Sequence, residues 1–382
     1  MKTLWHVCRI LLGLVFIFSG FVKGIDPWGM AYKFTDYFNA WGMESLTPLA
    51  FPLGILLSAS EFIIGIALVF NVIISFTSSV SLLFMGFFTV VTLVVAIQNP
   101  VTDCGCFGDA LIITNWETFF KNILLLAFAI IVFIYRKQYK PAKFQPVGTI
   151  MAAATVVVFA YFVDYSYNHL PIIDFRPYKI GVNIPEGMSV PEGAPRDIYE
   201  NTFHYKNKNT GEVNEFDQEN YPWQDTLNWE FVSRDEPILV QKGYEPPIHN
   251  FFIETQDGED IKDFFLYDEN YTFFFISKNI QDADLSNIEQ VKELANYAKE
   301  KGMNFIGLTS SLQEDMDAFV SDNEIPFELF NGDETTLKTM VRSNPGLMLI
   351  KNGTILDKWH YHDIPSVEEF EKQLKYFKQL GK

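Results

Sequence analysis

The chain of 382 residues carries 29 Lys and Arg residues against 47 Asp and Glu residues, a formal net charge of −18. This acidity argues against nucleic acid as a partner, because binding to phosphates needs a basic surface. Residues 1–166 hold 9 basic and 8 acidic residues, net +1, whereas residues 167–382 hold 20 and 39, net −19. Such a division excludes a single uniform soluble domain.

The first half contains apolar stretches about long enough to cross a bilayer core of roughly 30 Å. We predict five membrane spans, at Leu4–Val22, Phe51–Phe70, Ser75–Ile97, Thr118–Tyr135 and Val147–Val163. The first stretch resembles a secretory signal peptide in length, but no small-residue cleavage site follows it, so we predict a retained span. Four spans, or a broken third helix, are the competing interpretation.

The Lys and Arg residues near the span ends predict the orientation, because cytoplasmic loops carry the excess of positive charge. The opposite loops hold only Lys23, Lys33 and Lys121. The cytoplasmic side is assigned Lys2, Arg9, Arg136, Lys137, Lys140 and Lys143. The N-terminus is therefore expected in the cytoplasm, and the loop Gln98–Asn115 and everything after Asp164 outside it. In a bacterium with an outer membrane, this means an inner-membrane protein with a periplasmic C-terminal domain.

Outside the spans, the stretch Ile25–Ala50 is expected to be a loop rich in Trp, Tyr and Phe. Residues 167–243 are expected to combine a proline-containing extended linker, Leu170–Pro195, with a small β-rich segment. The segment includes a hairpin, Asn201–Lys206 and Glu212–Asp217, around a turn with Asn209 and Gly211.

Residues 244–382 show alternating strand and helix patterns. The expected elements, in chain order, are strands at Ile248–Glu254 and Tyr271–Ser277, a helix at Leu285–Lys301, a strand at Asn304–Leu308, a helix at Leu312–Asp322, a strand at Phe327–Phe330, a helix at Glu334–Val341, a hairpin of Gly346–Lys351 with Thr354–Trp359, and a helix at Val367–Leu380. The predicted fold class is thus multi-domain, with an α-helical transmembrane bundle at 1–166 and an α/β domain with a mixed sheet at 244–382.

Two motifs in the α/β part resemble the thioredoxin fold, particularly its peroxiredoxin-like and thiol-reductase branches. They are Pro247–Phe251 followed by Asp257-Gly258, and Ser343–Leu347 with its central Pro345. The resemblance implies that Pro345 is a cis proline facing a redox site. However, Ser277–Ile280 stands where the family carries Cys-x-x-Cys, and no cysteine follows position 106. This domain therefore cannot perform thiol chemistry by itself.

All cysteine chemistry is confined to Cys8, Cys104 and Cys106. Cys8 in the first span is interpreted as a packing residue. Cys104 and Cys106 lie in the loop assigned to the oxidising side. A disulfide between them closes a very small ring, and strained disulfides are easier to reduce. A redox pair, a static loop staple and a partial metal site all stay open, although two cysteines do not complete a zinc site. No neighbouring basic residue indicates a strongly activated thiolate.

A second resemblance covers about residues 4–135. Arg9, Gly13, Phe16, Ser19, Gly20 and Lys23 in the first span, Glu61 in the second, and Cys104–Gly108 with Lys121-Asn122 are similar to the DoxX/MauE superfamily of membrane proteins. The Cys-x-Cys-Phe-Gly motif points to the MauE branch, whose members are implicated in forming or maintaining disulfides in periplasmic proteins. Four spans followed by a fifth and a thioredoxin-like domain resemble DoxX-family proteins of Bacteroides-like bacteria.

Glu61 lies near the middle of its predicted span, where a lone charge costs several kcal/mol unless it is paired or protonated. We expect Arg9 to be its partner, unless Arg9 extends to the interface instead. The two residues form a candidate intramembrane polar site that would bind a quinone head or relay a proton. A buried ion pair that only specifies helix packing is the structural alternative.

Two functional hypotheses follow. The first is a membrane-bound thiol-disulfide redox protein, or an accessory factor, in which Cys104 and Cys106 exchange disulfides with an extracytoplasmic client that the thioredoxin-like domain binds. No cofactor is evident, and quinone is open as the electron acceptor. The alternative is a non-catalytic membrane scaffold in which the two cysteines staple a loop. Membrane lipid is a partner in both, and whether the chain is an enzyme stays open.

Overall fold

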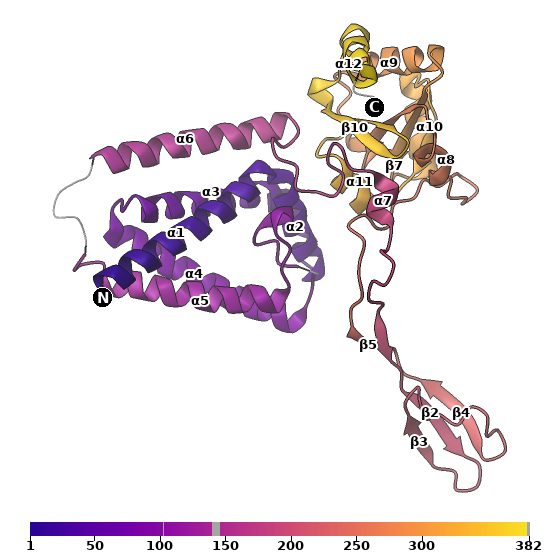
Figure 1. Cartoon of the computed structure of the whole chain (residues 1–382), viewed down its shortest axis with the longest axis horizontal. Helices are drawn as coiled ribbons and strands as arrows, with labels where there is room; N and C mark the ends of the chain where they lie inside the picture. Colours follow the sequence, from indigo (N-terminus) through magenta and orange to yellow (C-terminus); the bar gives the residue numbers. More distant parts are fainter. Residues whose placement is uncertain (102, 140–145, 380–382) are drawn as a thin grey trace. The chain divides into compact units, whose positions relative to one another are not determined.

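The structure is a computed structural model that describes residues 1–101, 103–139 and 146–379. Five helices in it are long and apolar enough to cross a membrane (Figure 1). They are α1 (Lys2–Ile25), α3 (Ala50–Val69, entered through the 3-10 helix Glu44–Leu49), α4 (Ile74–Gln98), α5 (Asn115–Tyr135) and α6 (Pro146–Asn168). The five predicted spans are confirmed as apolar helices. Lys140 and Lys143, on which the predicted orientation partly depends, lie outside the described residues.

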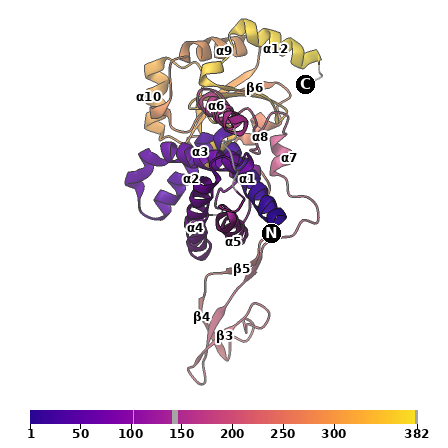
Figure 2. The ribbon, with the colours of Figure 1, turned by 90° about the vertical axis from the view of Figure 1, so that its left-hand side faces the viewer.

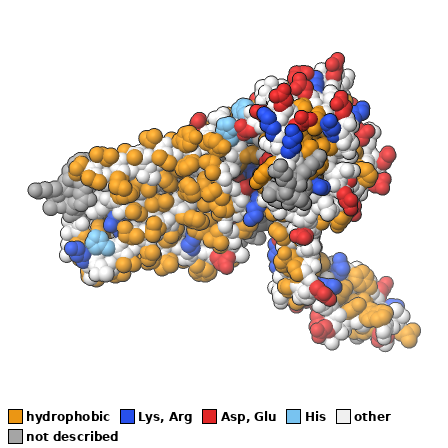
Figure 3. All heavy atoms as spheres, turned by 45° about the horizontal axis from the view of Figure 1, so that its top comes forward, with side chains coloured by type: hydrophobic (Ala, Val, Ile, Leu, Met, Phe, Trp, Pro, Cys, Tyr) orange, Lys and Arg blue, Asp and Glu red, His pale blue; other side chains and the backbone are white. Residues whose placement is uncertain are grey.

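Small residues bring α1 and α3 into close antiparallel contact. A Cβ atom added to Gly20 would lie 2.6 Å from the backbone of Ser58, and one added to Gly65 would lie 2.6 Å from the backbone of Ile17. Helices in a membrane associate through this kind of close packing, since lipid removes most of the hydrophobic driving force between them. Apolar side chains cover much of the visible outer surface of the helical part (Figure 3).

The stretch after α1 is not a loop. Helix α2 (Pro27–Ala40) begins directly behind α1, so the prediction of a loop across Ile25–Ala50 is wrong for most of its length. The Asp26 side chain accepts a hydrogen bond of 2.9 Å from the Gly29 amide, and Pro27 occupies the first turn. A capping Asp followed by proline is a standard helix start. With 14 residues, α2 is too short to be recognised as a membrane span.

The C-terminal domain has a five-stranded mixed sheet in the order β10-β9-β6-β7-β8. The parallel strands are β6 (Tyr271–Ser277), β7 (Asn304–Thr309) and β8 (Leu329–Asn331), and the antiparallel pair is β9 (Gly346–Lys351) and β10 (Thr354–His360). This order, with crossover helices between the parallel strands and a terminal hairpin, is that of a thioredoxin-like domain. The predicted fold class is confirmed.

Helices cover this sheet. They are α8 (Lys262–Leu266), α9 (Ile288–Glu300), α10 (Gln313–Asn323), α11 (Glu334–Met340) and α12 (Val367–Gln379). Phe273 and Phe275 of β6 pack in one cluster with residues of α9 and α12, which lie over the same side in Figure 2. The expected strand at Ile248–Glu254 is wrong: only Glu254 pairs, through isolated bridges to Asp260 and Asn331.

Residues 183–250 form a separate compact unit. It contains α7 (Ile184–Met188), the two-stranded sheet of β1 (Ile198–Glu200) with β5 (Ile238–Gln241), and the three-stranded sheet of β2 (Phe203–Asn207), β3 (Val213–Phe216) and β4 (Trp229–Arg234). The predicted hairpin is present as β2 and β3. Within the stretch expected as an extended linker, Leu170–Pro195, residues Ile184–Met188 form the helix α7. The buried ring of Tyr205 packs against Phe216 and against Phe231, which is itself largely exposed, so Tyr205 is the centre of a small aromatic cluster.

Candidate functional site

Cys104 and Cys106 lie between α4 and α5 in a loop whose shape depends on glycine. Gly105 and Gly108 have φ angles of +64° and +51°, in the left-handed region that side chains with a Cβ rarely adopt. The Gly105 amide donates a 2.9 Å hydrogen bond to the Asp103 carboxylate. A Cβ on Gly105 would also lie 3.0 Å from Cγ of Lys33. Glycine at position 105 therefore serves both the backbone turn and the close packing of α2.

The two thiols belong to one hydrogen-bonded chain. Both cysteines are free, and their side chains share a hydrogen bond. The Tyr37 hydroxyl of α2 interacts in turn with Cys104. The hydrogen bond between the cysteines raises the pKa of Cys104 and lowers the pKa of Cys106 to about 6; burial opposes the second shift, and the charges of Lys121 and Lys23 reinforce it. Cys106 is therefore the thiol that ionises first.

This environment corrects one expectation. The sequence shows no basic neighbour and gave no indication of an activated thiolate, yet the fold brings Lys121 of α5 and Lys23 of α1 to the Cys106 side. The Lys121 ammonium lies 4.2 Å from the ring centroid of Phe107, the residue that follows Cys106. Both lysines come from positions far from the loop in the chain, which is why adjacency in the sequence could not reveal them.

Glu61 is paired, but not with Arg9. Lys23 Nζ lies 2.8 Å from each carboxylate oxygen of Glu61, and both side chains are buried. Arg9 instead donates to the backbone carbonyls of Leu68 and Val69 at the end of α3, the latter at 2.9 Å. The expected pairing of Arg9 with Glu61 is therefore wrong. The antiparallel register of α1 and α3 places Glu61 level with Lys23 and places Arg9 a few turns away.

A hydrogen-bonded path connects this ion pair to the cysteine loop. Lys23 Nζ also donates to Ser19 Oγ over 3.1 Å, and Ser19 Oγ donates to the carbonyl oxygen of Cys106 over 2.7 Å. Ser19 and Lys23 are one helical turn apart, so both side chains lie on the same face of α1. Sequence reasoning noted these two residues in a motif but missed their role. The signal available was the Ser-x-x-x-Lys spacing at the end of α1.

These groups border a cavity of about 520 Å³ inside the helical part. Its polar lining includes Cys104, Cys106, Lys23, Glu61 and Lys121. The remaining wall is mostly apolar and aromatic, and comes from α1, α2, α3, α4 and α5. The sequence alone indicates two separate features, the candidate redox pair and the intramembrane carboxylate. In the structure both line the same cavity and form one site.

The thioredoxin-like domain contacts α2 through the segment that replaces Cys-x-x-Cys. Lys278 Nζ donates to the Tyr32 hydroxyl over 3.1 Å and lies 5.6 Å from the ring centroid of Trp28. The Asn344–Pro345 peptide bond is cis. Ser277 Oγ donates to Oδ1 of Asn344 over 2.9 Å, so a hydroxyl and an amide occupy this edge of the sheet.

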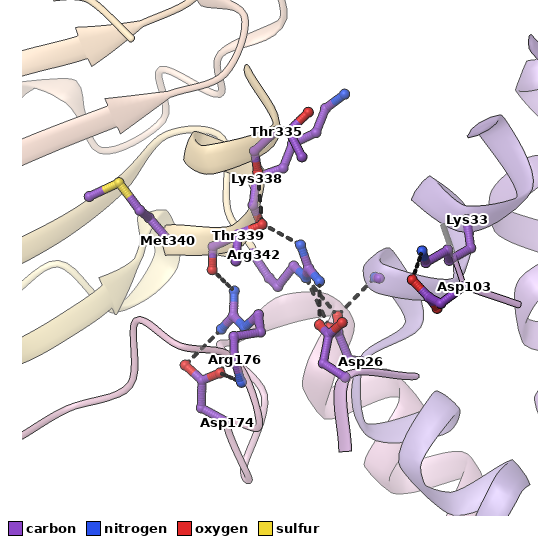
Figure 4. A network of polar contacts seen from close by, with 12 residues as sticks. Asp26, Lys33, Asp103, Asp174, Arg176, Thr335, Lys338, Thr339, Met340 and Arg342 are labelled. Carbon is purple, nitrogen blue, oxygen red and sulfur yellow. Dashed lines mark hydrogen bonds and ion pairs between the residues drawn. The ribbon is translucent and has the colours of Figure 1, made fainter. Parts of the chain in front are cut away.

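Arg342 makes the second contact between the domains (Figure 4). Its Nε lies 2.9 Å from Oδ2 of Asp26, and its Nη2 lies 3.1 Å from Oδ2 of Asp109. Asp26 caps α2 and Asp109 follows the cysteine motif. Because the Arg342 side chain is buried, its charge depends on these two carboxylates for compensation, and loss of both would leave it unpaired. Lys33 of α2 adds a 2.6 Å ion pair to Asp103, the residue before Cys104.

A buried network of ion pairs and hydrogen bonds lies next to Arg342. Asp174 accepts from Arg176 over 2.7 Å, and Arg176 Nη1 donates to the Thr339 carbonyl over 3.0 Å (Figure 4). Asp174 also accepts from Lys358 of β10 over 2.5 Å. Burial raises the pKa of Asp174, but the two cations outweigh it and hold that pKa at about 2. The carboxylate is therefore ionised at neutral pH and fixes the chain after α6 to α11 and β10.

Comparisons with known protein families match two separate segments of the chain. Residues 1–135 match the family model of the methylamine utilisation protein MauE, and residues 199–242 match a domain family of unknown function, DUF8463. No curated protein matches the chain.

Solved structures give weaker likenesses. A candidate protein disulfide isomerase from Bacteroides thetaiotaomicron is 15% identical, with a TM-score of 0.26, over 34% of this chain and 84% of its own. A cysteine-to-serine mutant of Xylella fastidiosa PrxQ is 11% identical, with a TM-score of 0.24, over 35% and 90%. The sheet order identifies the fold of the C-terminal domain. The chain thus joins a helical membrane part, of which residues 1–135 are similar to the MauE family, to a thioredoxin-like domain.

Proposed function

We propose that the protein is a membrane thiol-disulfide oxidoreductase whose redox centre is the pair Cys104 and Cys106. One observation carries the proposal: both cysteines line one cavity with Lys23, Glu61 and Lys121, and in this setting Cys106 has the lower pKa of the two thiols. A loop staple needs no such difference in acidity. A redox pair benefits from it, because the more acidic thiol is both the first to ionise and the better leaving group.

The exchange with a client runs through the oxidised pair. A client thiolate attacks Cys104 Sγ, the bond between Cys104 and Cys106 breaks, and Cys106 leaves as a thiolate. A second client thiolate then attacks the client sulfur of the mixed disulfide, which releases Cys104 as a thiolate and leaves the new disulfide in the client. The protein gains the two electrons that the client loses. The attack falls on Cys104 because Cys106 is the more acidic leaving thiol.

Thiol trapping in native membranes tests this function. We expect the wild-type pair to be found both oxidised and reduced and to respond to added reductant. Cys106→Ser should accumulate a mixed disulfide between Cys104 and a client, whereas Cys104→Ser should accumulate much less. Cys8→Ser is the matched control and should behave as wild type. A pair that stays oxidised and inert under every reducing condition, with no trapped client, would overturn the proposal.

The thioredoxin-like domain serves in this proposal to position the cysteine loop and to bind the client. Lys278, at the end of β6, packs on Trp28 and Tyr32 of α2. The client therefore has to bind to another surface of this domain. The same contact favours the second candidate, a non-catalytic scaffold. A scaffold predicts that the Cys104→Ser/Cys106→Ser double variant retains full function in cells, whereas an oxidoreductase predicts that it loses function.

We also propose that the chain lies in a bacterial inner membrane with its N-terminus in the cytoplasm and its cysteine loop and C-terminal domain in the periplasm. The distribution of Lys and Arg around the spans supports this orientation. Labelling of a cysteine placed at exposed Glu300 with a membrane-impermeant maleimide should succeed in cells whose outer membrane is permeabilised. Labelling only after rupture of the inner membrane would reverse the orientation.

A further inference from the structure

We propose that the 520 Å³ cavity beside Cys106 binds the ring of a membrane-soluble quinone, which accepts two electrons from the cysteine pair. The inference rests on the proposed function, because only a pair that cycles needs an electron acceptor. Each client disulfide leaves Cys104 and Cys106 reduced, and the pair has to lose two electrons before the next exchange. Among the residues that the structure describes, no other cysteine lines this cavity or could take those electrons.

The cavity has the size and lining that suit a flat apolar ring. Pockets for small ligands commonly enclose about 300–1,000 Å³ and are mostly apolar, with a few fixed polar groups. Aromatic side chains from three elements meet here: Phe34 of α2, Phe84 and Phe88 of α4, and Phe107 of the cysteine loop. A planar ring can stack on such faces or meet their edges. A charged or strongly polar acceptor would lose its hydration without replacement.

The polar groups gather at the end of the cavity that holds the cysteines. Lys23 is fully engaged, with three donor contacts to Glu61 and Ser19. Lys121 differs: among the described residues it forms no ion pair, and its ammonium faces the ring of Phe107 at 4.2 Å. We assign it as the donor to a carbonyl oxygen of the quinone. A cation at this position stabilises the negative charge that the oxygen gains on reduction.

The cavity also reaches the surface of the helical part that faces lipid. Leu56 of α3 and Phe87 of α4 line it, and their side chains are 62% and 63% exposed. Both belong to membrane-spanning helices. A quinone dissolved in the bilayer can therefore enter sideways between these helices and leave its apolar tail in the lipid. This lateral access distinguishes a membrane-soluble acceptor from a soluble one.

The proposed step balances in atoms and electrons. Both S–H bonds break, one S–S bond forms between Cys104 and Cys106, and two electrons pass to the quinone. Two protons end on its two oxygens and give the hydroquinone. The thiol proton of Cys106 leaves when that thiol ionises, and the path from Ser19 through Lys23 to Glu61 lies beside it to hold or pass a proton. The hydroquinone then returns to the bilayer.

The test uses the purified full chain in detergent, with the pair first reduced and the reductant removed. Decylubiquinone is added, and the disulfide is measured by the mass shift of alkylated protein while hydroquinone is followed by its absorbance. We expect one hydroquinone per disulfide and a rate that saturates with quinone concentration. Val91→Trp and Ser60→Trp fill the cavity from α4 and α3, and should raise the half-saturating concentration roughly tenfold or more.

Two variants on the same helices are the matched controls. Val90→Trp and Ile63→Trp lie on exposed surfaces outside the cavity lining and should keep the wild-type concentration dependence. Every protein is also tested for exchange with oxidised dithiothreitol, which needs no cavity. Failure of that exchange in the wild type overturns the proposed function itself. Normal exchange without saturable oxidation by quinone, or with unaltered oxidation in the cavity-filling variants, overturns only the quinone site and leaves a lipid acyl chain as its occupant.

Discussion

Lys23 of α1 donates to both carboxylate oxygens of Glu61 of α3 at 2.8 Å, and Ser19 links this pair to the carbonyl of Cys106. The two charges thereby compensate each other inside a membrane helix bundle, where an isolated charge is unfavourable. Their position beside the cysteine loop gives the ion pair a consequence beyond packing. Lys23 contributes to the lowered pKa of Cys106, and Glu61 opposes it.

Removal of one partner of the pair should destabilise the bundle strongly. Lys23→Met leaves the Glu61 carboxylate buried without a cation, and we expect a loss of about 3–5 kcal/mol in the free energy of unfolding. The Lys23→Met/Glu61→Gln double variant should recover most of that loss, because neither residue then carries a charge. Unfolding in a denaturing detergent, followed by the helical circular dichroism signal, measures both. A double variant as unstable as the single one would show that the pair contributes through more than its charges.

Alkylation of Cys106 should depend on pH with a midpoint near its pKa of about 6. Only the thiolate reacts, so the rate should rise as pH increases through this value and level off above it. For a simple thiol with a pKa near 8.5, the alkylation rate would still increase with pH in the range where the rate for Cys106 has levelled off. Mass spectrometry after timed treatment with a membrane-permeant iodoacetamide identifies the site. Lys121→Met should move the midpoint to higher pH, and an unmoved midpoint would exclude an effect of that lysine on the thiol.

Arg342 should hold α2 in place. Arg342→Met removes the ion pairs to Asp26 and Asp109 and leaves two carboxylates in the contact. We expect faster amide hydrogen exchange across Pro27–Ala40 than in the wild type, with exchange in the α9 region unaltered. Lys292→Met is the matched control, since it removes a basic residue of the same domain whose ion pair with the exposed Glu289 lies within α9 and contributes little. Equal exchange of α2 in both variants would contradict a special role of Arg342.

The glycine between the cysteines should be the more sensitive of the two loop glycines. Gly105→Ala strains a left-handed backbone, at a cost of roughly 1–2 kcal/mol, and places its Cβ against Lys33. Gly108→Ala imposes a similar strain, but its Cβ would meet open space. We therefore expect slower disulfide exchange in Gly105→Ala than in Gly108→Ala, measured with oxidised dithiothreitol. Equal rates would show that backbone strain alone accounts for both.

The local pattern of the sequence predicted much of the fold. Long apolar runs predicted all five spans, and β6 was predicted with its observed bounds because its residues form one apolar run between turn signals. Two of the local predictions that failed have a clear physical reason. The stretch Ile25–Ala50 contains a helix that is too short and too polar for a search for spans. The segment Ile248–Glu254 has a strand-like composition, yet it does not pair along a strand of the sheet. Only Glu254 forms isolated bridges.

Within the site, the sequence by itself determined which groups could act. The sequence has cysteines only at positions 8, 104 and 106, and none in the thioredoxin-like domain. It also has a carboxylate, Glu61, in the second span. Only the tertiary structure decided how these groups combine. Because α1 and α3 pack antiparallel, Glu61 forms its ion pair with Lys23 rather than with Arg9. The fold also places Lys121 close enough to Cys106 to affect its pKa. Partners that lie 38 residues apart, as Lys23 and Glu61 do, are set by helix register, which no local pattern in the sequence encodes.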